Sequence, residues 1–306
     1  MITPPTIDPH TAALIRMAVR EDMGHGSYGT VQGDRTVQAS IPQEARSVGN
    51  MVTRKAGVVA GTFLLGPILR EYQVGLECVV LVPDGMRVAA GQAIATISGG
   101  TRAILSAERV LLNFLGHLSG VATLTRRFVD AVAGVTPPPA IVDTRKTTPG
   151  YRALDKYAVR CGGGVNNRMG LYDGVMLKDN HLAALKARLG AVTLAELTAR
   201  LRAELPVEVT LWLEVDTLEQ LREALPGGGA DIVLVDNFTP GEMREAMKLR
   251  NDYSGSGGQG RRPLIEASGG ITLENVAEIA ATGVERIAIG ALTHSAGILD
   301  ISMEFQ

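Results

Sequence analysis

The sequence predicts an α/β protein in which a small, mostly antiparallel sheet domain precedes a barrel of parallel strands and helices. In the second half, short apolar runs alternate with amphipathic helical patterns, which is typical of a parallel sheet covered by helices. In the first half, strand-like runs are separated by turn signals. A chain of 306 residues with 45% hydrophobic residues can fill a barrel and an attached smaller domain.

Composition excludes several classes of protein. The chain has 30 Lys+Arg against 32 Asp+Glu, so it lacks an overall basic field for nucleic acid. Its start does not resemble a signal peptide, and no run approaches the roughly 20 apolar residues of a membrane span. We therefore expect a cytoplasmic protein that binds neither nucleic acid nor membrane. Cys78 and Cys161 are too few for a disulfide framework or a zinc site, and we expect two reduced thiols.

The first elements are a short helix and a glycine-rich turn. Residues 11–22 place apolar side chains at helical spacing, and the pattern ends at Gly24. The following GHGSYG, Gly24–Gly29, matches G-x-G-x-x-G, but a dinucleotide fingerprint follows a strand and opens a helix. Because this one follows a helix, we interpret it as a turn, with His25 as a loop residue.

Strand-like runs at 50–61, 78–88 and 90–99 predict the small sheet, with a short helix at 62–72 and a tight turn at Pro83–Gly85. A long apolar-periodic helix then runs from Thr101 to residue 132, and Gly116 and Gly120 predict a break or kink in it. Within this helix His117 is interpreted as a core histidine, whereas Arg109, beside an apolar stripe, needs a partner. Residues 137–139, all proline, form a rigid spacer.

After the spacer the chain becomes a periodic array. Six apolar runs, each halted by polar residues or glycine, occur at 140–146, 174–180, 210–216, 231–237, 263–270 and 286–292. Helical patterns lie between most of them, at 189–205, 218–225, 241–250 and 273–283. Such singly wound units predict a barrel, in which the carboxyl ends of the strands share one mouth.

The predicted mouth collects charge from distant parts of the sequence. It brings together Arg145, Lys146, Lys178, Glu214, Asp236 and Ser268. Glu214 and Asp236 suit Mg²⁺, which prefers oxygen ligands and bridges to substrate phosphates. The loops Ser268-Gly269-Gly270, before a helix expected at Thr272, and Gly290-Ala291 can hold phosphate through backbone N–H groups. The chain has no P-loop motif. These features predict a substrate with phosphate or pyrophosphate, and a second anion for the surplus Arg and Lys.

Several long blocks resemble the quinolinate phosphoribosyltransferase family over nearly the whole chain. They are DTRKTTPGYRALDKYAVRCGGG, GLYDGVMLKDNH, LEVDTLEQL, VLVDNF, SGGITLENV, GALTHSAGILDIS and the helix ERVLLNFLGHLSGVATLTRRFVDAV. The resemblance implies an N-terminal α/β sandwich domain at 1–118, with 292–306 packed back on it, and an open α/β barrel at 119–291, as in type II phosphoribosyltransferases. It also implies a homodimer or higher homo-oligomer whose active sites are shared between subunits.

The resemblance further implies a reaction: quinolinate and phosphoribosyl pyrophosphate give nicotinate mononucleotide, pyrophosphate and CO₂, with Mg²⁺. Arg145, Lys146, Asn167 and Arg168 would bind the pyridine carboxylates, with Arg109 reaching in from the neighbouring subunit. Lys146 and Lys178 would meet the ribosyl substrate, and Glu214 and Asp236 would serve Mg²⁺ and the ribose hydroxyls. The 5′-phosphate would lie on Ser268, Gly269, Gly270, Gly290 and Ala291. Catalysis would thus rest on Lys146, Lys178, Glu214 and Asp236.

Three positions depart from the family pattern. Asn167 stands where the family usually has a histidine that helps to bind quinolinate, and an amide cannot carry charge. Ser27, Tyr28 and Gly29 replace an Asp-Thr sequence after the early glycines. Trp212, two residues before Glu214, replaces a second glutamate and shares its strand face. These departures leave open a phosphoribosyltransferase paralogue that acts on a different heteroaromatic acid. A non-catalytic member that binds phosphoribosyl ligands is disfavoured by the retained Lys146, Lys178, Glu214 and Asp236.

Overall fold

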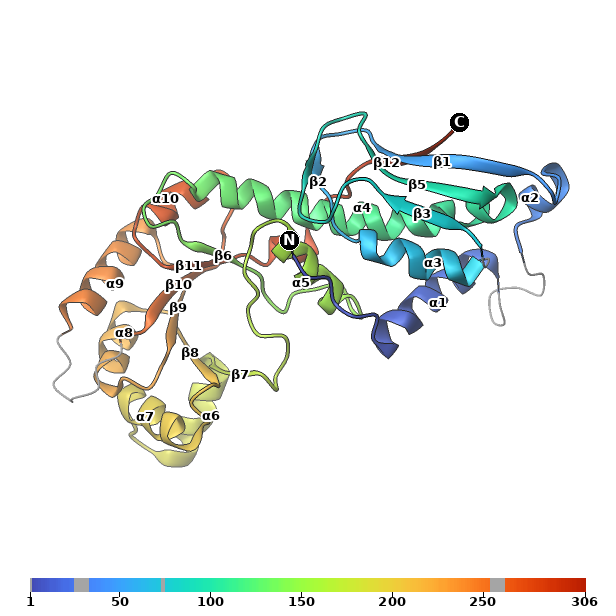
Figure 1. The fold of residues 1–306 in the computed structure, drawn as a ribbon. Helices are drawn as coiled ribbons and strands as arrows, with labels where there is room; N and C mark the ends of the chain where they lie inside the picture. Colours follow the sequence, from blue (N-terminus) through green and yellow to red (C-terminus); the bar gives the residue numbers. More distant parts are fainter. Residues whose placement is uncertain (1, 25–32, 73–74, 254–261) are drawn as a thin grey trace. The chain divides into compact units, whose positions relative to one another are not determined.

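We describe the protein from a computed structural model, which places residues 2–24, 33–72, 75–253 and 262–306. The chain divides into two compact units (Figure 1). The first comprises the chain up to residue 126, together with 147–163 and 291–306, and the second comprises 127–146 and 164–290. The predicted turn at Gly24–Gly29, with His25 and Ser27, lies outside the described residues except for Gly24. No helix in the described ranges combines the length and apolarity needed to cross a membrane.

The first unit contains a four-stranded antiparallel sheet with the strand order β12, β1, β5, β3. Its strands are β1 (Arg46–Thr53), β3 (Glu77–Val80), β5 (Ala93–Gly100) and β12 (Ile301–Phe305), and β2 (Gly57–Val58) pairs with β4 (Arg87–Val88) beside it. The predicted small antiparallel sheet is therefore confirmed. The last strand, β12, comes from the end of the described chain and lies at the edge next to β1.

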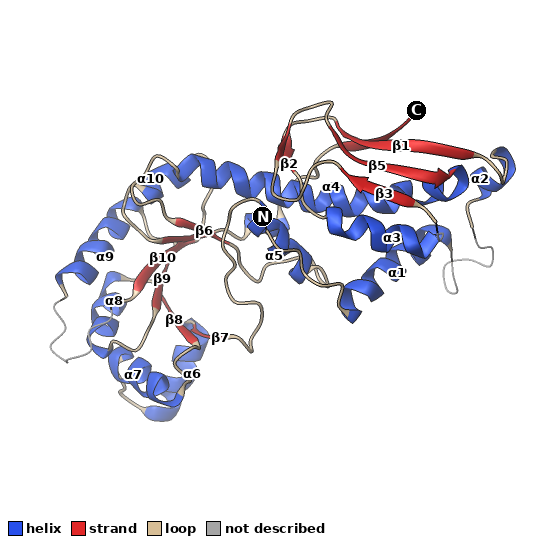
Figure 2. Cartoon of the chain, in the orientation of Figure 1, coloured by secondary structure: helices blue, strands red, loops and turns tan. Residues whose placement is uncertain are grey.

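Helices cover one face of this sheet. The first unit has α1 (Pro9–Met23), α2 (Arg35–Ser40), α3 (Leu65–Tyr72), most of α4 (Thr101–Val132), α5 (Arg152–Cys161) and α11 (Ala291–His294). Figure 2 shows α3 and α4 running along the sheet. Met51, Ile97 and Ile104, from β1, β5 and α4, are fully buried in the resulting core. Burying one such side chain contributes about 1.5–3 kcal/mol.

Helix α4 continues through Gly116 and Gly120, so the predicted break is wrong. A β carbon on Gly120 would lie 2.0 Å from the carbonyl oxygen of Gly297, and one on Gly116 would lie 3.1 Å from that of Leu299. The backbone N–H of Leu299 donates to the carbonyl of Gly116 at 2.9 Å. These glycines therefore serve the close approach of a later segment, which offsets their cost of about 1 kcal/mol each in a helix.

The chain's division differs in detail from the predicted 1–118 and 119–291 domains. The predicted boundary falls inside α4, which extends to Val132. Residues 147–163, which include α5, make their contacts within the first unit although they follow the first strand of the barrel. Residues 291–306 also belong to the first unit, where β12 pairs with β1.

The second unit is an open α/β barrel with a six-stranded parallel sheet. Its strands are β6 (Ala140–Val142), β7 (Gly174–Leu177), β8 (Thr210–Val215), β9 (Ile232–Asp236), β10 (Leu264–Ser268) and β11 (Arg286–Ala288). The order is β6, β11, β10, β9, β8, β7, so β6 and β7 are the two edges. Each predicted apolar run contains one of these strands. The strands β8 and β9 are almost completely buried, as expected for a sheet covered on its outer face.

Helices connect the strands in chain order. They are α6 (Asp179–Leu189), α7 (Leu194–Glu204), α8 (Leu218–Ala224), α9 (Pro240–Asp252) and α10 (Val276–Ala280). Thr193 and Thr239 form capping boxes with Glu196 and Glu242, which fix the starts of α7 and α9. The segment expected to be one helix over 189–205 instead ends α6 and forms α7 after Thr193.

The helix expected to begin at Thr272 begins later, at Val276. Asn275 explains the difference, because its Oδ1 accepts from the Thr272 N–H and its Nδ2 donates to the Gly270 carbonyl, both at 2.9 Å. These side-chain bonds stabilise a local turn in place of the first helical turn.

Candidate active site

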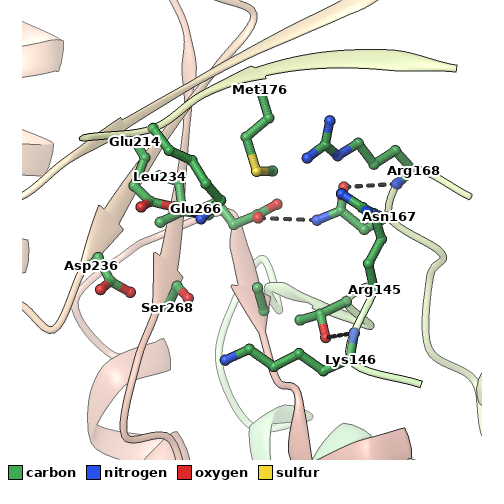
Figure 3. Close-up of a pocket in the computed structure, with 13 residues that line it drawn as sticks. Arg145, Lys146, Asn167, Arg168, Met176, Glu214, Leu234, Asp236, Glu266 and Ser268 are labelled. Carbon is green, nitrogen blue, oxygen red and sulfur yellow. Dashed lines mark hydrogen bonds and ion pairs between the residues drawn. The ribbon is translucent and has the colours of Figure 1, made fainter. Parts of the chain in front are cut away.

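A pocket of about 280 Å³ opens at the carboxyl ends of the strands of the second unit (Figure 3). Every strand of the sheet, or the residues directly after it, contributes to the lining. The lining consists of Thr144, Arg145, Lys146, Asn167, Arg168, Met176, Lys178, Glu214, Leu234, Asp236, Glu266, Ser268 and Ala288. The structure therefore brings together eight predicted residues: Arg145, Lys146, Asn167, Arg168, Lys178, Glu214, Asp236 and Ser268.

Strand register explains how the acidic residues meet. Leu234 pairs with both Glu214 and Glu266, so these three residues form one row across β8, β9 and β10. Asp236 pairs with Ser268 in the row two residues further along. Because side chains alternate along a strand, the two rows face the same side of the sheet.

Lys178 and Glu214 form an ion pair at the rim. Lys178 directly follows β7, and Glu214 lies near the end of the neighbouring strand β8. The Lys178 side chain is 43% exposed, whereas that of Glu214 is 13% exposed. A cation and a carboxylate are therefore held side by side, with the ammonium on the solvent side.

A hydrogen bond joins the carboxyl ends of β9 and β10 beside Asp236. The Asn237 side chain donates from Nδ2 to Asp236 Oδ2 at 2.8 Å, and its backbone N–H donates to the Ser268 carbonyl at 2.9 Å. Gly269 has φ of +88°, and a β carbon there would lie 2.1 Å from Asn237 Oδ1. Only glycine combines this backbone conformation with the available space, so the predicted phosphate loop has a structural reason for its first glycine.

Two arginines lie close together on the other side of the pocket (Figure 3). Burial and then the charge of Arg145 lower the pKa of Arg168 from its ordinary value, while Asp173 opposes the shift. Arg168 Nη1 donates to the carbonyl of Gly174 at 3.1 Å. An anionic ligand beside both guanidinium groups would offset the unfavourable effect of Arg145 on the charged form of Arg168.

Buried Asp143 fixes residues 166 and 167, which directly precede Arg168. Its Oδ1 accepts from the Asn167 N–H at 2.8 Å, and its Oδ2 accepts from Asn166 Nδ2 at 2.6 Å. The Asn167 side chain donates from Nδ2 to Glu266 at 3.2 Å, and its Oδ1 accepts from the Arg168 N–H at 2.9 Å. Asn167 thus lines the pocket as part of a network of hydrogen bonds.

Glu266 is a pocket residue that the sequence analysis missed. It is fully buried and forms an ion pair with Arg286 at 2.6 Å. Burial raises its pKa, although Arg286 and Asn167 stabilise the carboxylate. The signal was available, because Glu266 interrupts the apolar run before Ser268 and shares its strand face, and a buried acid needs a partner.

Trp212 lies among the residues below the pocket, as its alternation with Glu214 predicts. A β carbon on Gly174 would lie 2.7 Å from the indole ring, so the ring fills the space that a side chain at 174 would take. The buried indole N–H has no hydrogen-bond partner of good geometry among the described residues. Trp212 therefore places a large, buried apolar ring in the barrel interior.

The remaining predicted residues lie outside the pocket lining. Arg109 is exposed and lines a separate cavity of about 360 Å³ in the first unit, with Glu21, Asp22, Asn113 and Tyr151 among its neighbours. Gly269 and Gly270 follow β10, and Gly290 and Ala291 follow β11, but the lining reaches only Ser268 and Ala288 on these strands. His117, also in the first unit, pairs with the buried Asp155 at 2.7 Å, which fits its interpretation as a structural histidine.

The described residues contain no group of three or more His, Cys, Asp and Glu side chains suited to a metal. Glu214 and Asp236 nevertheless line one pocket. Mg²⁺ typically takes one or two protein carboxylates and completes its coordination with water and substrate phosphates. The two carboxylates therefore fit a Mg²⁺ ion that arrives with a phosphorylated substrate.

Comparisons with known proteins agree on one family. The chain matches the quinolinate phosphoribosyl transferase N-terminal domain over residues 34–119 and the C-terminal domain over residues 121–304. It is 43% identical over 294 residues to the carboxylating nicotinate-nucleotide pyrophosphorylase of Mycobacterium leprae, covering 95% of both chains. It is 41% identical over 272 residues to a probable enzyme of the same name from Bacillus subtilis, covering 89% of this chain and 88% of that one.

A solved structure supports the same relationship. The nicotinate-nucleotide pyrophosphorylase from Francisella tularensis superposes with a TM-score of 0.84 at 30% identity, covering 98% of both chains. The similarity therefore includes the first unit, the barrel and the order of their elements.

Proposed function

This chain belongs to the quinolinate phosphoribosyltransferase family, and we propose that its pocket joins quinolinate to phosphoribosyl pyrophosphate. The products are nicotinate mononucleotide, pyrophosphate and CO₂, so the enzyme is a pentosyltransferase of NAD biosynthesis. The observation that carries this proposal is the single pocket that gathers four cationic side chains with two rim carboxylates: Arg145, Lys146, Arg168, Lys178, Glu214 and Asp236.

Quinolinate has two adjacent carboxylates on a pyridine ring. We assign their binding to Arg145 and Arg168, with Lys146 and Asn167 beside them, because guanidinium groups bind carboxylates through paired hydrogen bonds. The mutual proximity of the two arginines supports this assignment, since a dianion relieves their repulsion.

The phosphoribosyl substrate would occupy the side of the pocket formed by β8, β9 and β10. Lys146 and Lys178 supply positive charge for the pyrophosphate, and Glu214 and Asp236 accept hydrogen bonds from the ribose hydroxyls. The loop at Ser268, Gly269 and Gly270, with Gly290 and Ala291 after the next strand, would hold the 5′-phosphate through backbone N–H groups. The positive φ of Gly269 supports that role.

The chain's residues can promote both parts of the reaction. The pyridine nitrogen attacks the anomeric carbon while pyrophosphate leaves, so the lysines stabilise growing negative charge on the leaving group, and the carboxylates stabilise positive charge on the sugar. The ribosylated ring nitrogen is cationic and stabilises the carbanion left on the adjacent ring carbon when its carboxylate leaves as CO₂, and this carbon then takes up a proton from solvent. We therefore expect the reaction to need no organic cofactor.

Glu214 and Asp236 are the residues that we propose to hold Mg²⁺. The ion would neutralise charge on the departing pyrophosphate. We expect EDTA to abolish turnover and added Mg²⁺ to restore it, measured as pyrophosphate release. Unchanged turnover in EDTA would remove the metal from the proposal.

The direct test is incubation with quinolinate, phosphoribosyl pyrophosphate and Mg²⁺. Nicotinate mononucleotide and CO₂ should form in equal amounts and should disappear in the Glu214→Ala variant. If neither product forms, the assignment to quinolinate is wrong.

Asn167 and Trp212 favour a second candidate, a phosphoribosyltransferase that acts on a different heteroaromatic acid. Compared with the family pattern of a histidine and a glutamate at these positions, an amide at 167 in the pocket lining and an indole below it alter the charge and the shape of the pocket. Pyrophosphate release with another pyridine or pyrimidine acid, and none with quinolinate, would select this candidate.

We further propose a homodimer or higher homo-oligomer in the cytoplasm. The exposed Arg109, which lines a cavity of the first unit, would complete the pocket of a neighbouring subunit. Its charge suits one of the ring carboxylates.

A further inference from the structure

The pocket contains a carboxylate that the proposed reaction does not use. Glu266 is fully buried, and its two oxygens serve different donors. Oε1 accepts from Asn167 Nδ2 at 3.2 Å, and Oε2 accepts from Arg286 Nε at 2.6 Å. Because a buried charge is costly unless it is paired and hydrogen-bonded, both partners are required by the carboxylate.

The bond to Glu266 decides which way the Asn167 amide faces. With Nδ2 directed at Glu266, Oδ1 is directed at the backbone N–H of Arg168, from which it accepts at 2.9 Å. The Arg168 side chain is held in turn by the Gly174 carbonyl, at 3.1 Å from Nη1. Figure 3 shows Glu266, Asn167 and Arg168 following one another along the wall of the pocket.

Trp212 closes this series of contacts from below. Its ring occupies the space next to the Cα of Gly174, whose carbonyl accepts from the Arg168 side chain. The backbone of Arg168 is therefore fixed by Asn167, which is bonded to Glu266. Its guanidinium group is fixed by Gly174, which packs against Trp212.

We propose that Glu266 is a positioning residue for the pyridine dicarboxylate: through Asn167 it sets the direction of Arg168, which binds a ring carboxylate. This inference rests on the proposed function, because it assigns that ligand to Arg168. Glu266 should therefore affect the affinity for the ring acid. It should not affect the affinity for phosphoribosyl pyrophosphate, because the hydrogen bonds that link Glu266 to Asn167, and Asn167 to Arg168, do not involve the side chains proposed to bind that substrate.

The first test is Glu266→Gln. An amide offers one acceptor oxygen where the carboxylate offers two, so it cannot serve Asn167 and Arg286 together. We expect KM for quinolinate to rise about ten-fold, the effect of losing one hydrogen bond to a charged group, while KM for phosphoribosyl pyrophosphate changes less than about two-fold. A purely structural defect would alter both constants or kcat alone.

Reversal of the hydrogen bond gives the sharper test. Asn167→Asp keeps the acceptor for the Arg168 N–H, removes the donor to Glu266 and adds a negative charge beside the ring acid, so it should raise KM for quinolinate by at least the same factor. In the double variant, a glutamine at 266 can donate to an aspartate at 167 and still accept from Arg286. We expect KM for quinolinate in the double variant to be lower than in Asn167→Asp alone. If the increases in KM of the two single variants multiply instead, the proposal is overturned.

Glu285→Gln is the matched control. Glu285 is also paired with an arginine, Arg250, but it precedes β11 and lies away from the pocket lining. It should leave KM for quinolinate unchanged. An unchanged melting temperature in each variant would show that the fold is intact.

The outcomes separate this inference from the function on which it rests. If the unmodified protein does not turn over quinolinate, both proposals fall. If it does, but Glu266→Gln leaves KM for quinolinate unchanged or shifts both KM values equally, only the positioning role is overturned.

Discussion

The ion pair between Lys178 and Glu214 places a cation and a carboxylate at the same point of the rim. We expect Lys178→Met to lower kcat by about 10²–10³-fold, because it removes a preorganised positive charge from the leaving group. Thermal stability should change little, since a partly exposed ion pair contributes about 1 kcal/mol or less. Steady-state kinetics and a thermal melt test this.

Lys248→Met is the matched control for Lys178. Lys248 is an exposed lysine of the same unit, paired with Asp252 at 2.9 Å on α9. It should keep full activity. An equal loss of activity in both variants would mean that general charge, rather than the position of Lys178, determines the rate.

We expect the Cys161 thiol not to react with thiol reagents in the folded protein. Burial, with a smaller effect of the nearby Asp84, raises the pKa of its thiol to about 12. At pH 8 only about one thiol in ten thousand is then ionised, and the thiolate is the reactive form. A colorimetric thiol reagent should therefore modify Cys161 only after unfolding, which a Cys161→Ser variant would verify by the loss of that signal. Rapid labelling of Cys161 in the native protein would contradict this.

The sequence predicts a pocket residue wherever a charged residue lies at or near the carboxyl end of a strand. Lys178, Glu214 and Asp236 follow this rule, because parallel strands present their carboxyl ends on one side. Glu266 was missed because it interrupts a strand instead of ending one. Its importance depends on Asn167 and Arg286, which lie far from it in sequence and meet it only after the sheet has formed.

At the scale of elements, α4 depends on two glycines that a helix would ordinarily avoid. Gly120→Ala should destabilise the first unit by about 1–3 kcal/mol, because its β carbon would overlap the Gly297 carbonyl. Gly116→Ala should cost less, since the contact there is 3.1 Å. Chemical denaturation of each variant measures the difference.

Gly134→Ala is the control, because no atom lies within 4 Å of a β carbon there. It should leave the free energy of unfolding nearly unchanged. Equal stability of the Gly120→Ala and Gly134→Ala variants would show that the chain after α11 can move away from α4 without loss.

Element types were more predictable than element limits. Apolar periodicity identified all six barrel strands and the long helix, because both patterns reflect burial on a regular spacing. The start of α10 depends instead on the hydrogen bonds of the Asn275 side chain, which stabilise a turn before the helix. The sequence predicts helix breaks at the glycines of α4 because their partners, Gly297 and Leu299, lie about 180 residues away.

For the whole molecule, the proposed sharing of active sites can be tested by mixing two inactive variants. Arg109→Ala should inactivate a site through its neighbour, and Lys178→Met should inactivate a site from within. After subunit exchange, a mixed dimer has one site with both defects and one with neither. Roughly a quarter of the normal activity should return in an equal mixture of a two-fold symmetric dimer.

The same mixture made without subunit exchange should stay inactive, which provides the control. If exchange restores nothing, although size measurements show that mixed oligomers form, Arg109 serves no neighbouring site. In that case its cavity in the first unit has a separate role.

The pairing of β12 with β1 has a consequence for how the protein is made. A ribosome completes residues 127–146 and 164–290 before it reaches residues 301–305, so β1 emerges with only β5 available as a partner. During that interval β1 is an exposed sheet edge, which can pair with other chains. The barrel is therefore synthesised completely before the sheet of the first unit can be completed. Until β12 pairs with β1, we expect the nascent chain to be most prone to aggregation.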